Sequence, residues 1–300
     1  MPGPATSASR PTGEAREGLP PIFFRIMEIF KLPPPEREGD HVWYFSYGSN
    51  MKSEVFCKRR GIVAQETVRC QLPGYVLSYA LDGLPYLEPA FATCVKREQS
   101  IEADARPDVH GVAFRITETE LKRVLATEGG CGWHDGSVGG YRLSSVRAID
   151  YDGKSLDVWT LTNERCDIQR PGASRNCPSQ RYKGLVVDGA KEVGLDSKYI
   201  AWLEQQSAYT GAGPGWKFTV AKLLMIILIG LPSMMQFVIV NPLIMRASGN
   251  WRPPWLVTKC FRLYNTAAKF FVLPLLALFA GSGYHNDDGE QTTRTKTKNK

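Results

Sequence analysis

The stretch VWYFSYGSNM, residues 42–51, carries six residues typical of a β-strand and then runs directly into Gly-Ser-Asn. Two interpretations are open. The turn can simply end a strand, as glycine commonly does. Alternatively, Gly48 lets the backbone approach a ligand closely, and the N–H groups of Gly48, Ser49 and Asn50 bind a carboxylate with the help of the Ser49 hydroxyl. A helix opening within residues 52–60 favours the same anion through its N-terminal dipole.

The charge of the 300-residue chain is concentrated towards its C-terminal end. Residues 41–212 carry 21 basic and 21 acidic side chains, whereas residues 213–300 carry 11 basic and 3 acidic ones. A nucleic-acid-binding protein normally has its basic patch on the folded domain, so this distribution argues against nucleic acid as a partner. It indicates a neutral globular body with a cationic tail. The seven cysteines form no CxxC pair, which favours a reducing compartment and hence a cytoplasmic body.

Composition divides the chain into four parts. Residues 1–40 are predicted to be a disordered linker that contains a short apolar helix at 22–32, and their start shows no secretory signal. Residues 41–212 form the globular body. Residues 213–282 are predicted to be hydrophobic helices that associate with a membrane, and residues 283–300 are a basic polar tail.

The body is predicted to contain several strands and few helices. Thr117 and Glu120 form the capping-box pattern of a helix that a Gly-Gly pair ends at 129–130. Asp196 is a candidate N-cap for a second helix. Because strands and helices do not alternate, we expect an α+β fold around a curled sheet. The predicted strands lie at residues 42–47, 72–81, 91–97 and 110–117, and a hairpin over 141–163 turns at Asp152-Gly153.

The last third of the chain contains two long apolar stretches. Residues 223–240 contain no charged side chain over 18 positions, close to the length that spans a bilayer. Residues 255–281 begin like an interfacial helix and end in an apolar segment that is too short to span alone. A buried helical hairpin in a soluble protein fits the same pattern. The flanking tryptophans and basic residues favour membrane association, either as one span or as a hairpin in one leaflet.

Several segments of the body resemble the γ-glutamylcyclotransferase family. YFSYGSNM resembles the family's Tyr-Gly-Ser-Asn loop after the first strand. HGVAFRITETELKRVLATEGG, residues 110–130, resembles the segment that ends in Glu-Gly, and GGYRLSSVRAI resembles the strand that follows it. PSQRYKGLVVDGAKEVGLDSKYIAWLEQQ, residues 178–206, resembles the C-terminal segment. The resemblance covers residues 41–212 in the same order. It implies a small curled mixed β-sheet or barrel with flanking helices, to which the C-terminal hydrophobic region is an addition.

The resemblance also implies which residues form the site. Glu128 is the Glu that precedes Gly, which is the catalytic acid and base of the family. The substrate-contacting residues that the resemblance implies are Tyr44, Phe45, Ser46, Tyr47, Gly48, Ser49, Asn50, Tyr141 and Tyr182. The implied enzyme converts a γ-glutamyl amide, either a γ-glutamyl amino acid or a glutathione-derived adduct, to 5-oxoproline and a free amine. Such a reaction belongs to glutathione or secondary-metabolite processing.

The reaction needs few chemical groups. The α-amine attacks the γ-carbonyl of its own glutamyl group, so one carboxylate can take a proton from the attacking nitrogen and give one to the leaving nitrogen. Because the reaction is intramolecular, a loop that holds the α-carboxylate fixes the reactive conformer. No metal or organic cofactor is required. The expected partners are a small γ-glutamyl substrate and, through the C-terminal region, a membrane.

Two questions stay open in the sequence. Residues 131–140 and 165–177 look like insertions near the expected site, and they leave the identity of the leaving group open. The alternative function is a membrane-tethered protein that binds a γ-glutamyl ligand without turning it over.

Overall fold

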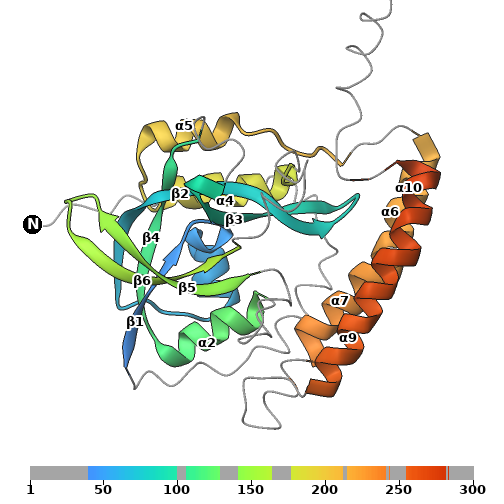
Figure 1. Cartoon of the computed structure of the whole chain (residues 1–300), viewed down its shortest axis with the longest axis horizontal. Helices are drawn as coiled ribbons and strands as arrows, with labels where there is room; N and C mark the ends of the chain where they lie inside the picture. The colour runs from blue at the N-terminus through green and yellow to red at the C-terminus, as the bar shows by residue number, and fades with distance from the viewer. Residues whose placement is uncertain are drawn as a thin grey trace, which may run out of the picture.

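The computed structural model describes residues 40–99, 106–128, 141–163, 177–211, 215–240, 243, 255–281 and 283. Figure 1 shows a β-barrel with helices around it and a pair of long helices along one side. The expectations for the N-terminal linker and its helix, for most of the two insertions, for the Gly-Gly pair and for the basic tail concern residues outside the described part of the chain.

Six strands form one curled sheet. They are β1 (His41–Ser46), β2 (Glu66–Leu84), β3 (Glu88–Lys96), β4 (Asp108–Thr117), β5 (Arg142–Asp150) and β6 (Ser155–Thr162). The hydrogen-bonded order is β1-β4-β2-β3-β6-β5, and β1 also pairs with β6. Strands β1, β4, β2, β3 and β6 therefore close into a ring, while β5 is bonded to both β6 and β2.

Both parallel and antiparallel pairs contribute to the barrel. β6 meets β1 in parallel at Trp159 and Tyr44 and meets β3 in parallel at Thr162 and Cys94. The pairs β1–β4, β2–β3, β2–β4 and β5–β6 are antiparallel. The predicted α+β fold with a curled, mixed sheet is thus confirmed.

Strand β2 supplies much of the curvature. Its register shifts between Leu72 and Val76 against β4 and between Ser78 and Leu81 against β3. Such irregularities bend a strand and increase its twist, which allows a sheet to curl onto itself. The hairpin of β5 and β6 turns at Asp152-Gly153, as predicted, and Gly153 adopts a positive φ of 86°.

Aromatic side chains fill the barrel next to β1. Phe56 stacks on Phe114 with ring centroids 4.3 Å apart, and it also stacks on Tyr44 with ring centroids 6.0 Å apart. Phe45 is fully buried within the same core. Burying an apolar side chain of this size contributes about 1.5–3 kcal/mol, so the end of β1 is held firmly in place.

Three helices flank the barrel, and two of their N-termini were predicted. Helix α2 (Glu118–Thr127) begins with the complete capping box between Thr117 and Glu120. Helix α5 (Ser197–Gln205) begins at Asp196, whose carboxylate accepts from two backbone N–H groups. Helix α4 (Gln180–Glu192) begins at Ser179 and packs against the turn after β1. There Gly189 leaves no room for a side chain, since a Cβ atom would lie 2.8 Å from the Lys52 nitrogen.

The C-terminal region forms two antiparallel helices, hereafter the helix pair. The first comprises α6 (Gly215–Met225), a π-helical segment (Ile226–Gly230), α7 (Leu231–Met235) and a second π-helical segment (Gln236–Val240). The second comprises α9 (Trp255–Ala267), a π-helical segment (Ala268–Val272) and α10 (Leu273–Ala280). Trp216 at the start of the first contacts Phe279 at the end of the second, with centroids 5.7 Å apart.

A proline explains one irregularity of the first helix. Pro232 has no N–H to donate to the carbonyl of Leu228, four residues earlier, and the π-helical segment precedes it directly. The hydroxyl of Tyr264 in α9 donates to the Leu228 carbonyl. This hydrogen bond links the two helices close to the proline.

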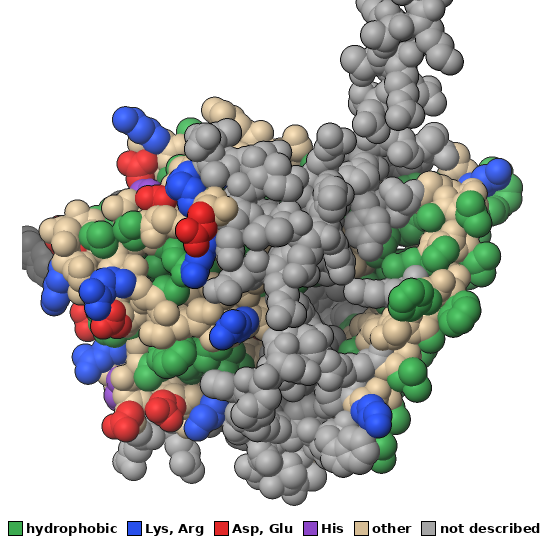
Figure 2. All heavy atoms as spheres, viewed as in Figure 1, with side chains coloured by type: hydrophobic (Ala, Val, Ile, Leu, Met, Phe, Trp, Pro, Cys, Tyr) green, Lys and Arg blue, Asp and Glu red, His purple; other side chains and the backbone are tan. Residues whose placement is uncertain are grey.

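The tip of the β2–β3 hairpin joins the barrel to the helix pair. Tyr86 lies at this tip, is buried, and packs edge-on against Phe218 of α6 at 5.3 Å. Its backbone N–H donates to the Gly283 carbonyl at 2.8 Å, and its hydroxyl donates to the Gly281 carbonyl. These contacts fix the helix pair against the barrel, while hydrophobic side chains cover its outer edge (Figure 2).

We predict that Gly111→Ala destabilises the protein by about 3 kcal/mol, at the upper end of the usual range for an overpacked core. A Cβ atom at this position of β4 would lie 2.2 Å from the Ser46 carbonyl oxygen and 2.7 Å from the Phe45 ring. Urea denaturation of the full chain measures the change. Gly184→Ala in α4 is the matched control, because nothing lies within 4 Å of its Cβ position. It should stabilise the helix by about 0.5–1 kcal/mol, and equal losses in both variants would contradict the prediction.

Candidate active site

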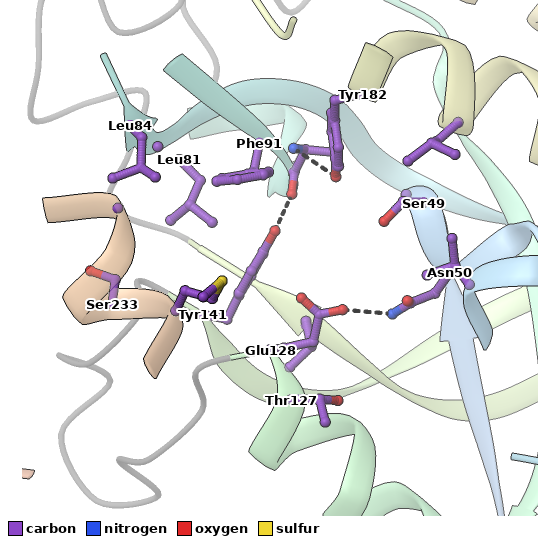
Figure 3. A pocket seen from close by; sticks show the side chains of 18 of the residues that line it. Ser49, Asn50, Leu81, Leu84, Phe91, Thr127, Glu128, Tyr141, Tyr182 and Ser233 are labelled. Atoms are coloured by element: carbon purple, nitrogen blue, oxygen red, sulfur yellow. Dashed lines mark hydrogen bonds between the residues drawn. The ribbon is translucent and has the colours of Figure 1, made fainter. Parts of the chain in front are cut away.

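A cavity of about 840 Å³ lies between the end of β1, the start of α4 and the helix pair. Of the residues predicted for the site, the structure brings Tyr44, Ser46, Tyr47, Gly48, Ser49, Asn50, Glu128, Tyr141 and Tyr182 into its lining. Figure 3 shows Asn50 and Glu128 facing each other at one end, with Leu81, Leu84 and Ser233 at the other.

Phe45 is the predicted residue that the structure separates from this set. Side chains alternate along a strand, so Phe45 points away from the side on which Tyr44 and Ser46 lie. It packs in the barrel core against Tyr47, with ring centroids 6.4 Å apart. Its place in the fold is to hold β1 rather than to face the cavity.

The turn after β1 is held by a hydrogen bond to the neighbouring strand β6 and by backbone hydrogen bonds within the turn. The Tyr47 hydroxyl donates to the Leu161 carbonyl of β6. Met51 N–H donates to the Gly48 carbonyl at 3.1 Å, and Lys52 N–H donates to the Ser49 carbonyl at 3.1 Å. A short 3₁₀ turn, Ser49–Met51, and a π-helical segment, Glu54–Arg59, follow in place of one regular helix.

Gly48 is required for close packing rather than for an unusual φ. Its φ is −110°, which other residues also adopt. A Cβ atom here would lie 3.3 Å from the Tyr182 hydroxyl and 3.7 Å from the Ala92 Cβ. The absence of a side chain at Gly48 therefore lets α4 and β3 approach the loop. The hydroxyl of the next residue, Ser49, faces the cavity (Figure 3).

The Asn50 side chain bridges the loop to the carboxylate of Glu128. Its Nδ2 donates to Glu128 Oε1 at 2.8 Å and to the Tyr44 hydroxyl at 3.3 Å. Its Oδ1 accepts from Arg60 Nε at 3.0 Å. Asn50 is buried, so these bonds satisfy its amide inside the protein. In this structure its side chain orients Glu128.

Glu128 lies at the C-terminal end of α2, with 20% of its side chain exposed. It forms an ion pair with Arg60, whose side chain is 12% exposed. Every hydrogen bond that the described residues make to Glu128 goes to Oε1. The second oxygen, Oε2, lies on the cavity side in Figure 3, where it can meet a bound molecule.

Arg60 and Thr127 are parts of the site that sequence reasoning missed. Arg60 also donates to the Thr127 hydroxyl, next to Glu128. It belongs to a basic run in which the neighbouring Arg59 pairs with an exposed carboxylate. Such a run normally indicates a solvated surface, so nothing local marked Arg60 as the one that turns inward.

Tyr141 and Tyr182 both bond to the backbone of one residue on β3, Ala92. The Tyr141 hydroxyl donates to the Ala92 carbonyl at 2.6 Å, and the Ala92 N–H donates to the Tyr182 hydroxyl at 3.3 Å. Burial, followed by the negative charge of Glu128, raises the pKa of Tyr44 and Tyr182 well above the ordinary value. Burial also raises the pKa of Tyr141. These phenols are therefore neutral hydrogen-bonding groups at physiological pH.

The described residues include no group of three or more His, Cys, Asp or Glu side chains placed to hold a metal ion. The polar groups that line the cavity are instead one carboxylate, three guanidinium groups, two side-chain amides and several hydroxyls. Such a set can bind a zwitterionic small molecule and can move a proton.

The barrel and its cavity define an α+β protein in which one carboxylate, that of Glu128, faces the loop of Gly48, Ser49 and Asn50. Gamma-glutamyl cyclotransferase aclK of Aspergillus oryzae is 34% identical over 187 residues, which are 59% of this chain and 65% of that protein. Gamma-glutamyl cyclotransferase gliK of Claviceps purpurea is 30% identical over 169 residues, covering 56% of this chain and 71% of that protein. The chain belongs to the γ-glutamyl cyclotransferase family.

A further relative and a solved structure resemble the chain at lower sequence identity. Gamma-glutamyl cyclotransferase gliK of Aspergillus fumigatus is 28% identical over 180 residues, 56% of this chain and 63% of that protein. The chain thus spans less than two thirds of the length of the two Aspergillus relatives. A solved gamma-glutamyl cyclotransferase structure is 19% identical, with a TM-score of 0.44, and covers 61% of this chain and 99% of that one. No family model matches the chain.

We predict that stability falls steeply above about pH 10. Because burial raises the pKa of Tyr44, Tyr79, Tyr141 and Tyr182, the folded state keeps protons that the unfolded state releases there. Their contribution is complete below about pH 10 and is lost above it, by up to about 1.4 kcal/mol per tyrosine for each pH unit. Urea denaturation across this pH range, followed by phenolate absorbance, measures the loss.

Tyr79→Phe is the informative variant for this prediction. Among the described residues the Tyr79 hydroxyl has no hydrogen-bond partner, so its removal should leave stability at pH 7 unchanged. Above about pH 10, the free energy of unfolding of this variant should fall less steeply with pH, because one tyrosine fewer contributes to the slope. Phenolate absorbance that rises before the protein unfolds would contradict the prediction.

Proposed function

We propose that this chain is a γ-glutamyl cyclotransferase that converts a γ-glutamyl amide to 5-oxoproline and a free amine. The observation that carries the proposal is the contact between Asn50 and Glu128, which sets a proton-accepting carboxylate against the loop of Gly48 and Ser49 in one cavity. The names of the relatives support a γ-glutamyl substrate, and we propose that it is a γ-glutamyl amino acid or a glutathione-derived adduct.

In the proposed mechanism, the loop binds the glutamyl head. The backbone around Gly48 and the Ser49 hydroxyl hold the α-carboxylate, while the aromatic rings of Tyr141 and Tyr182 limit the conformations of the chain. The substrate then folds back, so that its α-amine lies next to its own γ-carbonyl. Holding this conformer supplies much of the rate enhancement that an intramolecular reaction permits.

Glu128 then moves the proton. Its Oε2 accepts a proton from the attacking α-nitrogen, the new C–N bond closes the ring, and the same oxygen delivers a proton to the leaving nitrogen as the old C–N bond breaks. Arg60 and Asn50 act as positioning residues, because both bind Oε1 and keep Oε2 directed at the substrate. No oxidant, reductant or water molecule is consumed.

We predict that Glu128→Gln lowers kcat for 5-oxoproline release by about 10²–10⁴-fold, the usual contribution of a general acid and base. The amide of Gln still accepts from Asn50 and Arg60, so the site keeps its shape and loses only the proton transfer. Mass spectrometry of 5-oxoproline released from γ-glutamyl-alanine measures the rate.

Glu118→Gln is the matched control on the same helix, since its exposed carboxylate only pairs with Lys122 at 3.7 Å. It should turn over like the wild type. Normal turnover by a folded Glu128→Gln protein would remove Glu128 from the mechanism. Binding of the γ-glutamyl compound without any 5-oxoproline from the wild type would favour a non-catalytic binding protein.

We also propose that the helix pair associates with a membrane, leaving the barrel on the cytoplasmic side. Helices Gly215–Met235 and Lys259–Ala280 are long and apolar enough to cross a bilayer, and their most apolar windows are only 22% and 12% buried. Core helices of a soluble protein would be mostly buried. Trp216 and Lys217 lie at one end of the pair and Lys259 at the other, as in interfacial anchors.

We predict that the full chain floats with liposomes of mixed neutral and anionic lipids in a density gradient. Figure 2 shows hydrophobic side chains along the outer edge of the helix pair, and Leu278 is 86% exposed. Leu278→Asp should weaken binding by about 2–3 kcal/mol, the cost of a charge inside the bilayer.

Val63→Asp provides the matched control, since Val63 is an exposed apolar residue of the barrel. It should float like the wild type. A wild-type chain that stays in the aqueous fraction, or a Leu278→Asp chain that floats equally well, would argue against the membrane proposal.

A further inference from the structure

The cavity extends well beyond the groups that a γ-glutamyl head needs. Ser49, Asn50 and Glu128 occupy one end, which is polar. The other end is formed by the helix pair. Its lining residues there include the apolar Met225, Ile229, Met234, Phe261 and Leu273 and the polar Ser233, Asn265 and Thr266.

The barrel completes this second end with apolar side chains. Leu81, Leu84 and Phe91 of the β2–β3 hairpin face the helix pair across the cavity (Figure 3). The Asn265 amide of α9 also lines this end, but its Nδ2 is bonded to the Phe261 carbonyl at 3.0 Å. The cavity thus changes from charged and hydrogen-bonding at Glu128 to mainly apolar at the helix pair.

The volume of the cavity supports a large ligand. About 840 Å³ lies in the upper part of the range of about 300–1,000 Å³ that holds drug-sized molecules. A γ-glutamyl group is no larger than one amino acid residue, so it fills only the polar end. An apolar space of the remaining size favours a bulky apolar group, because such a group gains free energy from leaving water.

The wall that the helix pair provides is fixed to the barrel. Met225 and Ile229 line the cavity and are also buried in the cluster that packs around Tyr86 and Phe218. The same side chains therefore attach the helices and shape the cavity. A helix pair that served only as a membrane anchor would not need to place Ser233 and Phe261 in the lining of this cavity.

We propose that the helix pair is the leaving-group subsite, which selects γ-glutamyl amides whose amine carries a bulky, mainly apolar group. This inference rests on the proposed cyclotransferase function. The glutamyl head binds at Ser49 and Asn50, the scissile C–N bond lies beside Glu128, and the leaving amine extends towards Ser233. The reaction balances as before, with one C–N bond formed, one broken, and one proton passed between the nitrogens.

The test compares two substrates that differ only in the size of the leaving group. γ-Glutamyl-alanine and γ-glutamyl-(2-naphthyl)alanine release chemically similar α-amines, so a difference in kcat/KM reports binding rather than leaving-group chemistry. The full chain in detergent or liposomes should favour the naphthyl substrate by about tenfold or more. Released 5-oxoproline measures both rates.

Variants then locate the preference on the helix pair. Ser233→Phe fills the apolar end, and Met234→Ala removes apolar contact from it, so both should lower the ratio of the two kcat/KM values by about tenfold. Leu231→Phe is the matched control, because Leu231 lies on the same helix, is exposed and does not line the cavity. It should keep the wild-type ratio.

The outcomes separate the two proposals. If neither substrate yields 5-oxoproline, the cyclotransferase function itself fails. If both substrates turn over with equal kcat/KM, or if folded Ser233→Phe and Met234→Ala chains keep the wild-type ratio, the function stands and the leaving-group subsite is overturned. The wild-type substrate comparison decides the matter even when a variant does not fold.

Discussion

The pairing of β1 with a strand on each side is the constraint on which the site depends. β1 bonds to β4 along its whole length and meets β6 on its other edge. From β6, the Thr160 hydroxyl donates to the Phe45 carbonyl at 2.9 Å, and the Leu161 carbonyl accepts from Tyr47. The end of β1 therefore cannot shift towards either neighbour. The turn that follows leaves the barrel in one direction, and it reaches Glu128 on a different wall of the cavity.

The two ends of the cavity differ in how rigidly they are built. At the polar end, Asn50, Arg60 and Glu128 satisfy one another, and a change in any one leaves a partly buried polar partner without its bond. At the apolar end, side chains such as Met234 make contacts that have no fixed direction. The first arrangement suits a constant chemical group, and the second tolerates variation in the group that lies there.

Features decided by neighbouring residues were predictable, and features decided across the fold were not. The capping box of Thr117 and Glu120 and the N-cap Asp196 follow from backbone N–H groups that only nearby side chains can reach. Arg60 escaped prediction because its partner Glu128 lies 68 positions away in the sequence. The wall formed by the helix pair escaped it too, since the composition of an apolar helix does not reveal which surface the helix covers.

The attachment at Tyr86 also has a mechanical consequence. The β2–β3 hairpin is held by the helix pair at its tip, and farther along β3 it carries Ala92, whose N–H and carbonyl are bonded to Tyr182 and Tyr141. The hairpin therefore connects two attachment points, one to the helix pair at Tyr86 and one to the site tyrosines at Ala92. For a helix pair that lies in a bilayer, as proposed above, a tilt of the kind that bilayers of different thickness impose on helices would displace the aromatic groups beside Glu128.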